Sequence, residues 1–311
     1  MPQLASLLDA IGSTSLIPLR KIRPANGAAI LVKLEWENPT GSMKDRMALA
    51  VISRAEADGR LAPGGSVVEY TGGSTGASLA LVCAIKGYRI RIVTSDAFSR
   101  EKRDQMAAYG AELTLVESED GKTTKKLILD MIEKARELAA APGVYWTNQL
   151  ENQDAIAGYH ALGEEVWAQT GGKIDAFVQS VGTAASLRGA GTVLKRHSSG
   201  MRVVAVEPAE SAVLSGGAPG PHKIEGIGVG YVPPLWDASL VDDIVAVKTE
   251  DAKAMARRLA REEGIFAGTS SGANVIAALR VAERMGSGAQ VVTLMVDSGL
   301  KYLNTDVYRN S

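Results

Sequence analysis

Short apolar segments rich in β-branched residues alternate along this chain with longer segments of helical periodicity, and no other feature constrains the fold as strongly. We expect strands at Ala29–Leu34, Ser66–Tyr70, Arg89–Val93, Glu112–Val116, Asp175–Val181, Val203–Glu207 and Val291–Val296. We expect helices between them, at Lys44–Asp58, Gly76–Lys86, Arg100–Tyr109, Thr123–Ala140, Ala155–Gln169, Ala185–Arg196, Asp251–Glu263 and Ser271–Met285. Such alternation indicates an α/β fold with mostly parallel sheets whose two faces are covered by helices.

The length of 311 residues is sufficient for two α/β domains. No change of composition marks a linker, so we expect the chain to cross between two domains more than once. The Gly- and Pro-rich stretch Ser215–Pro234 has no clear periodicity. We expect it to form a loop over a functional site.

Charge and metal-binding residues exclude several classes of function. The charges of the 34 Lys and Arg nearly cancel those of the 35 Asp and Glu, which argues against binding to nucleic acid or an anionic membrane through a broad basic surface. The single cysteine, Cys83, lies in an apolar helical segment and is expected in the core, and the three histidines are too dispersed for a metal site. No signal peptide or membrane-spanning apolar run is visible. We therefore expect a cytoplasmic protein that binds no metal, no nucleic acid and no membrane.

A lysine lies where a helix should begin. In N-P-T-G-S-M-K-D-R, residues Asn38–Arg46, Gly41 favours a turn and Ser42 can cap a helix whose first turn contains Lys44. A cation at this end opposes the helix dipole. This placement indicates that Lys44 loses its charge or is used by the protein; a solvated lysine beside charged neighbours is the alternative.

Three elbows of small residues each open a predicted helix: T-G-G-S-T-G at Thr71–Gly76, G-T-A-A-S at Gly182–Ser186 and G-T-S-S-G at Gly268–Gly272. Backbone N–H groups at such helix starts suit an anion. Small residues also let a helix pack closely on its strand, so each elbow alone is weak evidence. Together they favour a ligand with separate anionic groups.

A further motif, D-S-G-L-K-Y-L-N-T at Asp297–Thr305, directly follows the predicted strand Val291–Val296. Ligands of open α/β sheets bind beyond the carboxyl ends of the strands. Ser298 would project there, unless the segment is simply a turn that ends the strand.

Taken in order, these motifs, together with Asn148–Asn152 and Lys223–Gly228, resemble the O-acetylserine sulfhydrylase (cysteine synthase) and cystathionine β-synthase family. The resemblance covers nearly the whole chain. It implies a pyridoxal 5'-phosphate enzyme of fold type II, with the cofactor in the cleft between two three-layer α/β domains. Residues 1–42 and 149–311 would form the larger domain that binds the cofactor phosphate, and residues 43–148 the smaller, mobile domain with the substrate loop.

The resemblance also implies roles for individual residues. Lys44 is similar to the Schiff-base lysine, which also serves as the base at Cα, and Ser298 is similar to the residue bonded to the pyridine nitrogen. The residues expected to bind the cofactor are Lys44, Ser74, Gly182, Thr183, Ala184, Ala185, Ser186 and Ser298. Those expected to bind the substrate are Thr71, Gly72, Gly73, Ser74, Thr75 and Gln149, with Gly226, Ile227 and Gly228 on the leaving-group side.

The substrate loop departs from the family pattern T-S-G-N-T-G at two positions. Gly72 lacks a hydroxyl that would bond the substrate carboxylate, and Ser74 is shorter than asparagine. Because each lost contact is worth roughly 0.5–1.5 kcal/mol, we expect weak binding of O-acetylserine or preference for another donor. We also expect Gly72 to leave room beside the substrate for a larger group or a bridging water.

The implied reaction is β-replacement on a serine derivative, most directly cysteine synthesis from O-acetylserine and sulfide by a homodimer. Condensation of serine with homocysteine to cystathionine is an alternative, slightly favoured by Glu225, where many cysteine synthases carry glutamine. A serine or threonine β-eliminating deaminase is another. A non-catalytic relative that binds the cofactor or an amino acid for regulation belongs to a different class, and the presence of Lys44 and Ser298 argues against it.

Overall fold

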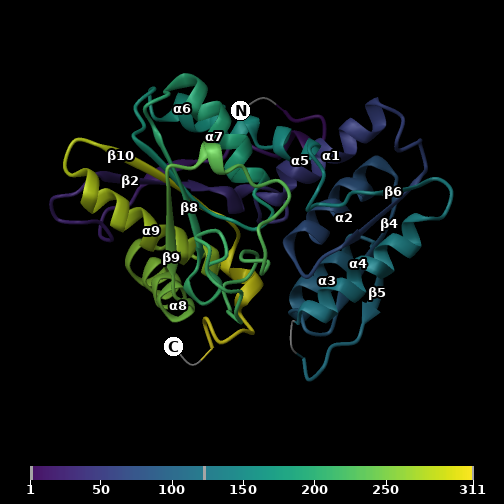
Figure 1. Cartoon of the computed structure of the whole chain (residues 1–311). Coiled ribbons are helices and arrows are strands. Elements are labelled where there is room, and N and C mark those ends of the chain that lie inside the picture. Colours follow the sequence, from purple (N-terminus) through teal and green to yellow (C-terminus); the bar gives the residue numbers. More distant parts are fainter. Residues whose placement is uncertain (1–2, 122–123, 310–311) are drawn as a thin grey trace. The chain divides into compact units, whose positions relative to one another are not determined.

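The computed structural model describes residues 3–121 and 124–309 and divides into two compact units (Figure 1). The smaller unit contains the chain up to Ile11 together with Lys44–Gly158, and the larger unit contains Gly12–Met43 together with the chain from Tyr159 onward. The sequence-based division instead gave all of residues 1–42 to the larger domain and ended the smaller one at 148. The segment before Gly158 stays with the smaller unit because it packs on the first long helix, where a Cβ on Gly158 would lie 2.9 Å from Arg46 O.

The larger unit is built on a six-stranded sheet in the order β1-β2-β10-β7-β8-β9. Its strands are β1 (Leu16–Pro18), β2 (Ala29–Leu34), β7 (Ala176–Ser180), β8 (Arg202–Pro208), β9 (Asp243–Val247) and β10 (Gln290–Met295). All neighbouring strands are parallel except β1 and β2. Figure 1 shows α6 (His160–Gln169) and α7 (Ala185–His197) on one side of this sheet, with α8 (Thr249–Arg258) and α9 (Thr269–Met285) on the other.

Both faces of the central strands are covered, which explains their nearly continuous apolar sequence. Every residue of β7 is buried, and Val204 and Val291 on the strands to either side are at most 1% exposed. Gln179 and Glu207 are polar exceptions, and both lie near the carboxyl ends of their strands. Since the strands β7, β8 and β10 are parallel, these ends meet at one edge of the sheet.

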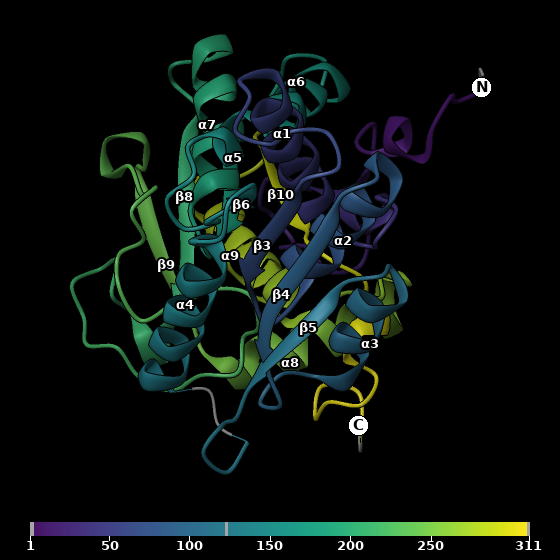
Figure 2. The ribbon, with the colours of Figure 1, turned by 90° about the vertical axis from the view of Figure 1, so that its right-hand side faces the viewer.

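The smaller unit is built on a four-stranded parallel sheet in the order β5-β4-β3-β6. Its strands are β3 (Ser66–Tyr70), β4 (Arg89–Ser95), β5 (Glu112–Val116) and β6 (Val144–Trp146), and its helices are α1 (Lys44–Ala57), α2 (Ser74–Lys86), α3 (Arg100–Ala108), α4 (Lys125–Ala139) and α5 (Asp154–Ala157). Figure 2 shows α4 on one side of the strands, with α2 and α3 on the other. Cys83 is fully buried in α2, as expected for a core residue, and burial raises the pKa of its thiol to about 12.

The predicted α/β class with mostly parallel sheets is confirmed, while some elements differ. The helix expected over Ala155–Gln169 is divided into α5 and α6, and β1, β6 and β9 were not predicted. The start of the helix expected over Thr123–Ala140 lies outside the described residues. Among the described residues, no helix is both long enough and apolar enough to cross a membrane.

Candidate active site

The elbow between β7 and α7 has the form of an anion cradle made of backbone. A Cβ on Gly182 would lie 2.5 Å from Gly226 O, so only glycine fits there. Ala184, the residue before α7, has a left-handed φ of 70°, and no side chain caps the helix. The first N–H groups of an α-helix have no partner within the helix, and they lie at the positive end of its dipole. The first turn of this 13-residue helix contains no acidic residue, so the elbow fits a phosphate group.

A polar pair lies beneath this elbow. Gln179 Nε2 donates to Ser186 Oγ in the first turn of α7 and also lies 4.0 Å from Met43 Sδ. Because Ser186 Oγ accepts this hydrogen bond, its own proton can turn toward a ligand. Gln179 Oε1 is buried and has no hydrogen-bond partner among the described residues. The elbow thus offers the Ser186 hydroxyl as a donor in addition to its backbone donors.

The loop containing Gly226, Ile227 and Gly228 is fastened directly to the elbow. Gly228 N donates to Val181 O at 3.1 Å. His222 holds the other side of the loop, since its Nδ1 accepts from Ile224 N at 3.3 Å and its Nε2 lies 2.9 Å from Gly228 O. A carbonyl only accepts, so Nε2 carries the proton and donates. His222 therefore has a structural role in this loop.

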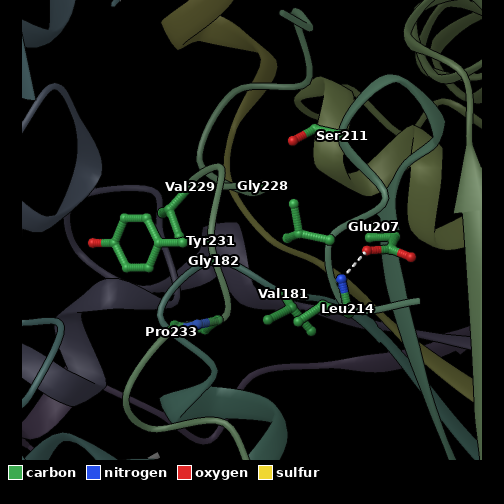
Figure 3. Close-up of a pocket in the computed structure, with 10 residues that line it drawn as sticks. Val181, Gly182, Glu207, Ser211, Leu214, Gly228, Val229, Tyr231 and Pro233 are labelled. Atoms are coloured by element: carbon green, nitrogen blue, oxygen red, sulfur yellow. Dashed lines mark hydrogen bonds between the residues drawn. The ribbon is translucent and has the colours of Figure 1, made fainter. Parts of the chain in front are cut away.

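A buried carboxylate anchors the long loop that begins near Ser215. Glu207, at the end of β8, is 1% exposed and accepts hydrogen bonds from Leu214 N at 2.7 Å and from Ser215 N at 3.2 Å. Figure 3 shows this carboxylate beside a pocket that is also lined by Gly182 and Gly228. The irregular Gly- and Pro-rich stretch is thus a loop, as expected, and part of it lines this pocket together with Gly182 of the elbow.

The turn that leads into Lys44 is bound to the segment that contains Ser298. Met43 N donates to Val296 O at 3.0 Å, and Ser298 N donates to Gly41 O at 2.9 Å. Gly41 has a left-handed φ of 73°, which glycine adopts without strain. Lys44 directly follows Met43 and is the first residue of α1, so the unusual position of this cation at a helix start is confirmed.

Ser298 is oriented by a short helical turn. Its Oγ accepts from Leu300 N at 3.3 Å as the cap of the 3₁₀ turn Gly299–Tyr302. Because the oxygen accepts this bond, the hydroxyl proton remains to be donated elsewhere. Ser298 follows β10 as Gly182 follows β7, and these neighbouring parallel strands end at the same edge.

In the smaller unit, Gln149 lies across the segment Thr71–Thr75, which joins β3 to α2 and includes the first two residues of that helix. Thr75 Oγ1 donates to Gln149 Oε1 at 2.8 Å, and Gln149 Nε2 donates to Tyr70 O at 3.0 Å. An amide nitrogen has two protons, so Nε2 has a second one to offer a ligand. The side chain of Gln149 is therefore held in one orientation beside the loop.

A buried carboxylate that the sequence analysis missed supports this arrangement. Glu69 is 0% exposed and accepts from Tyr70 N at 2.9 Å, Thr147 Oγ1 at 2.6 Å and Gln149 N at 2.9 Å. Burial raises the pKa of Glu69 to about 7, although these hydrogen bonds oppose the shift. A charged residue within the apolar strand S-V-V-E-Y, directly before the loop, was the signal that could have revealed it. Glu69 fixes the backbone of Gln149.

The raised pKa of Glu69 should appear in the pH dependence of stability. Between 4.5, the ordinary value, and about 7, the folded protein holds a proton that the unfolded chain has lost. Stability contributed by this group therefore falls as the pH rises through that window, at up to about 1.4 kcal/mol per pKa unit. Glu69→Gln should flatten this part of the profile in urea unfolding measured at about pH 5 and about pH 8. Equal slopes in the wild type and the variant would refute the assignment.

The predicted site residues fall into two groups, one in each unit. Those of the larger unit are Gly182, Thr183, Ala184, Ala185, Ser186, Gly226, Ile227, Gly228 and Ser298, and those of the smaller unit are Lys44, Thr71, Gly72, Gly73, Ser74, Thr75 and Gln149. One expectation about them is wrong. Gly72 leaves no room beside it, because a Cβ there would lie 2.3 Å from Phe98 Cδ1.

Comparisons with known proteins agree with these features. Residues 7–297 match the family described as "Pyridoxal-phosphate dependent enzyme". A cysteine synthase of Staphylococcus aureus (strain Mu50) is 43% identical over 306 residues, which cover 97% of this chain and 96% of that protein. The crystal structure of a cysteine synthase from Entamoeba histolytica matches with a TM-score of 0.93 and 38% identity, covering 100% of this chain and 92% of that one. An O-acetylserine dependent cystathionine β-synthase from Helicobacter pylori matches with a TM-score of 0.91 and 34% identity, covering 99% of this chain and 100% of that one.

Proposed function

Because the chain belongs to the family of pyridoxal-phosphate dependent enzymes, we propose that it makes cysteine from O-acetylserine and sulfide by β-replacement. Cysteine synthases resemble it over nearly their whole length in both sequence and structure. The observation that carries the proposal furthest is the binding of the turn before Lys44 to the Ser298 segment. Two backbone hydrogen bonds, from Met43 N to Val296 O and from Ser298 N to Gly41 O, hold this turn.

The residues present fit the cofactor. When bound, pyridoxal 5'-phosphate supplies an electron sink for charge that develops at Cα of the substrate. We assign its phosphate to the elbow Gly182–Ser186, where backbone donors and the Ser186 hydroxyl lie at a helix start. Ser298 would donate its hydroxyl proton to the ring nitrogen. A neutral partner leaves that nitrogen largely unprotonated, which suits elimination of a β-substituent followed by addition of a nucleophile.

The remaining roles fall on side chains of the smaller unit. The amine of Lys44 would hold the cofactor and then remove and return the proton at Cα, as a general base within reach of that atom. The loop Thr71–Thr75 and the second N–H of Gln149 would bind the substrate carboxylate. Glu69 would act only through Gln149, since its carboxylate is buried behind that residue.

Variants of Ser298 test the assignment of the ring partner. Ser298→Ala should retain the cofactor and a measurable fraction of activity, because a neutral hydrogen bond of roughly 0.5–1.5 kcal/mol is lost. Ser298→Asp should impair β-replacement more strongly, since a carboxylate would favour a protonated ring nitrogen. The measurements are steady-state rates and the absorption spectrum of the bound cofactor. Unchanged rates in both variants would show that Ser298 is not the ring partner.

The proposed reaction is tested by supplying two donors, O-acetylserine and serine, each with sulfide or homocysteine. Cysteine from O-acetylserine and sulfide should form with the highest kcat/KM. Faster formation of cystathionine from either donor would replace the proposal with the condensing alternative. Release of pyruvate without consumption of a thiol would indicate a β-eliminating enzyme instead.

Two further parts of the proposal rest on the family resemblance: the enzyme acts in the cytoplasm, and it does so as a homodimer. Sedimentation equilibrium of the cofactor-loaded protein should give twice the chain mass of 32.6 kDa. A single chain mass at micromolar concentration would contradict the homodimer.

A further inference from the structure

Gly72 is a glycine for reasons of space and not of backbone conformation. Its φ does not lie in the left-handed region where glycine is favoured. An added Cβ would lie 2.3 Å from both Cδ1 and Cε1 of Phe98 and 2.6 Å from its Cγ. These distances are far shorter than any real Cβ contact. The ring of Phe98 therefore occupies the place where a side chain at position 72 would begin.

Phe98 is held firmly in that place. Its N–H donates to Ser95 O at 3.3 Å, within the turn that leads into α3. The carboxylate of Asp96 ties this turn to the chain after β5 by accepting from Ser118 N at 2.8 Å and from Ser118 Oγ at 3.0 Å. The ring is partly buried and packs on the hydrophobic cluster that includes Tyr70 and Val93. It cannot move aside without loss of this packing.

The same segment also covers the second glycine of the loop. A Cβ on Gly73 would lie 3.3 Å from Cδ of Lys102, which is buried in α3. Phe98 lies two residues before α3 and Lys102 lies in its first turn, so both side chains come from the start of that helix. Gly72 and Gly73 therefore both face side chains from the start of α3, and these neighbours limit the size of the residues at positions 72 and 73.

We infer that Phe98 is a specificity-determining residue for the amino-acid substrate, acting with Gly72 as a matched pair that replaces a serine at position 72. The inference rests on the proposed function, because it takes Thr71–Thr75 as the loop that binds the substrate carboxylate. The ring offers an apolar surface with a weakly positive edge where a hydroxyl would otherwise lie. Carboxylate binding then depends on the backbone of the loop and on Gln149, while the ring limits the space available beside them.

This pairing predicts that a serine at position 72 acts in opposite directions with and without the ring. In Gly72→Ser alone, the new side chain collides with Phe98, and the affinity for O-acetyl-L-serine should fall at least about 10-fold. Phe98→Ala alone should weaken the binding of O-acetyl-L-serine several-fold, since the ring no longer limits the space beside the loop. The double variant should bind at least about 10-fold more tightly than the product of the single effects predicts, since contacting residues do not act additively.

The experiment measures the dissociation constant of O-acetyl-L-serine on cofactor-loaded protein by absorbance, together with the KM for sulfide and the melting temperature. The KM for sulfide should stay within about two-fold of the wild type, because the inference concerns only the amino-acid side of the site. Ile132→Ala is the matched control: Ile132 is a partly buried residue on the same hydrophobic cluster, and it should lower the melting temperature without changing substrate affinity. Phe98→Leu, which keeps apolar bulk, should lie between the wild type and Phe98→Ala.

Additive effects at positions 72 and 98, or a parallel change in the KM for sulfide, would overturn the inference. If the wild type binds another serine derivative and not O-acetylserine, the proposed function fails. The same cycle is then measured with the derivative that binds. Coupling with that ligand would support the role of Phe98, and additivity would refute it.

Discussion

Replacing Lys44 with alanine should lower the rate of cysteine formation by more than about 1,000-fold. A positioned general base alone contributes roughly 10²- to 10⁴-fold, and the variant also loses the amine that would hold the cofactor covalently. The rate is measured with saturating O-acetylserine and sulfide on protein dialysed against excess cofactor. The structure supports this assignment through the fixed turn Gly41–Met43, which leads directly into Lys44 at the start of α1.

Two controls separate chemistry from folding in that experiment. Lys44→Arg keeps the positive charge and should be as inactive as Lys44→Ala, because a guanidinium remains protonated and cannot hold the cofactor covalently. Lys173→Ala, at an exposed position of the larger unit, should retain full activity. If Lys44→Ala keeps more than a tenth of the wild-type rate, Lys44 is not the catalytic lysine.

Gly182→Ala should have the second largest effect, on cofactor affinity. The new Cβ would lie 2.5 Å from the backbone oxygen of Gly226, so the elbow or the adjoining loop must move. Such overpacking typically costs about 1–3 kcal/mol, which corresponds to roughly a 5- to 150-fold weaker dissociation constant when it falls on the bound state. Equilibrium dialysis after removal and re-addition of pyridoxal 5'-phosphate measures this constant.

Gly200→Ala is the matched control for this change. Gly200 lies in the same unit, has no left-handed φ and would place its Cβ more than 4 Å from any other group. It should leave the cofactor affinity within about two-fold, as surface substitutions usually do. Equal affinity in Gly182→Ala and Gly200→Ala would exclude the elbow as the phosphate site.

Local patterns in the sequence were sufficient to predict much of the fold. Strands β2, β3 and β5 are apolar runs bounded by turn residues, and their predicted limits agree with the structure. Strands β1 and β6 contain only three residues, too few to show a period of two. The division between α5 and α6 occurs near Gly158. This position requires a glycine because α1 approaches it closely. That requirement is a tertiary contact and has no local signal.

The candidate site shows more clearly that contacts between distant parts of the chain have no local sequence signal. The elbow at Gly182 and the lysine at the start of α1 could be predicted, because the turn residues lie directly before the helix in the sequence. The missing hydroxyl at Gly72 is apparent from the sequence, whereas the expectation of empty space there is wrong. Phe98, which fills that space, is distant in sequence, and only the folded chain brings its ring onto the loop.

Borohydride reduction of the cofactor-loaded protein tests whether Lys44 holds the cofactor. Reduction fixes the cofactor permanently to the lysine that holds it, and peptide mapping by mass spectrometry then identifies that lysine. A single modified peptide that contains Lys44 is expected, with none in Lys44→Ala. Modification of a different lysine in the wild type, or reduced protein without any attached cofactor, would show that Lys44 does not hold the cofactor.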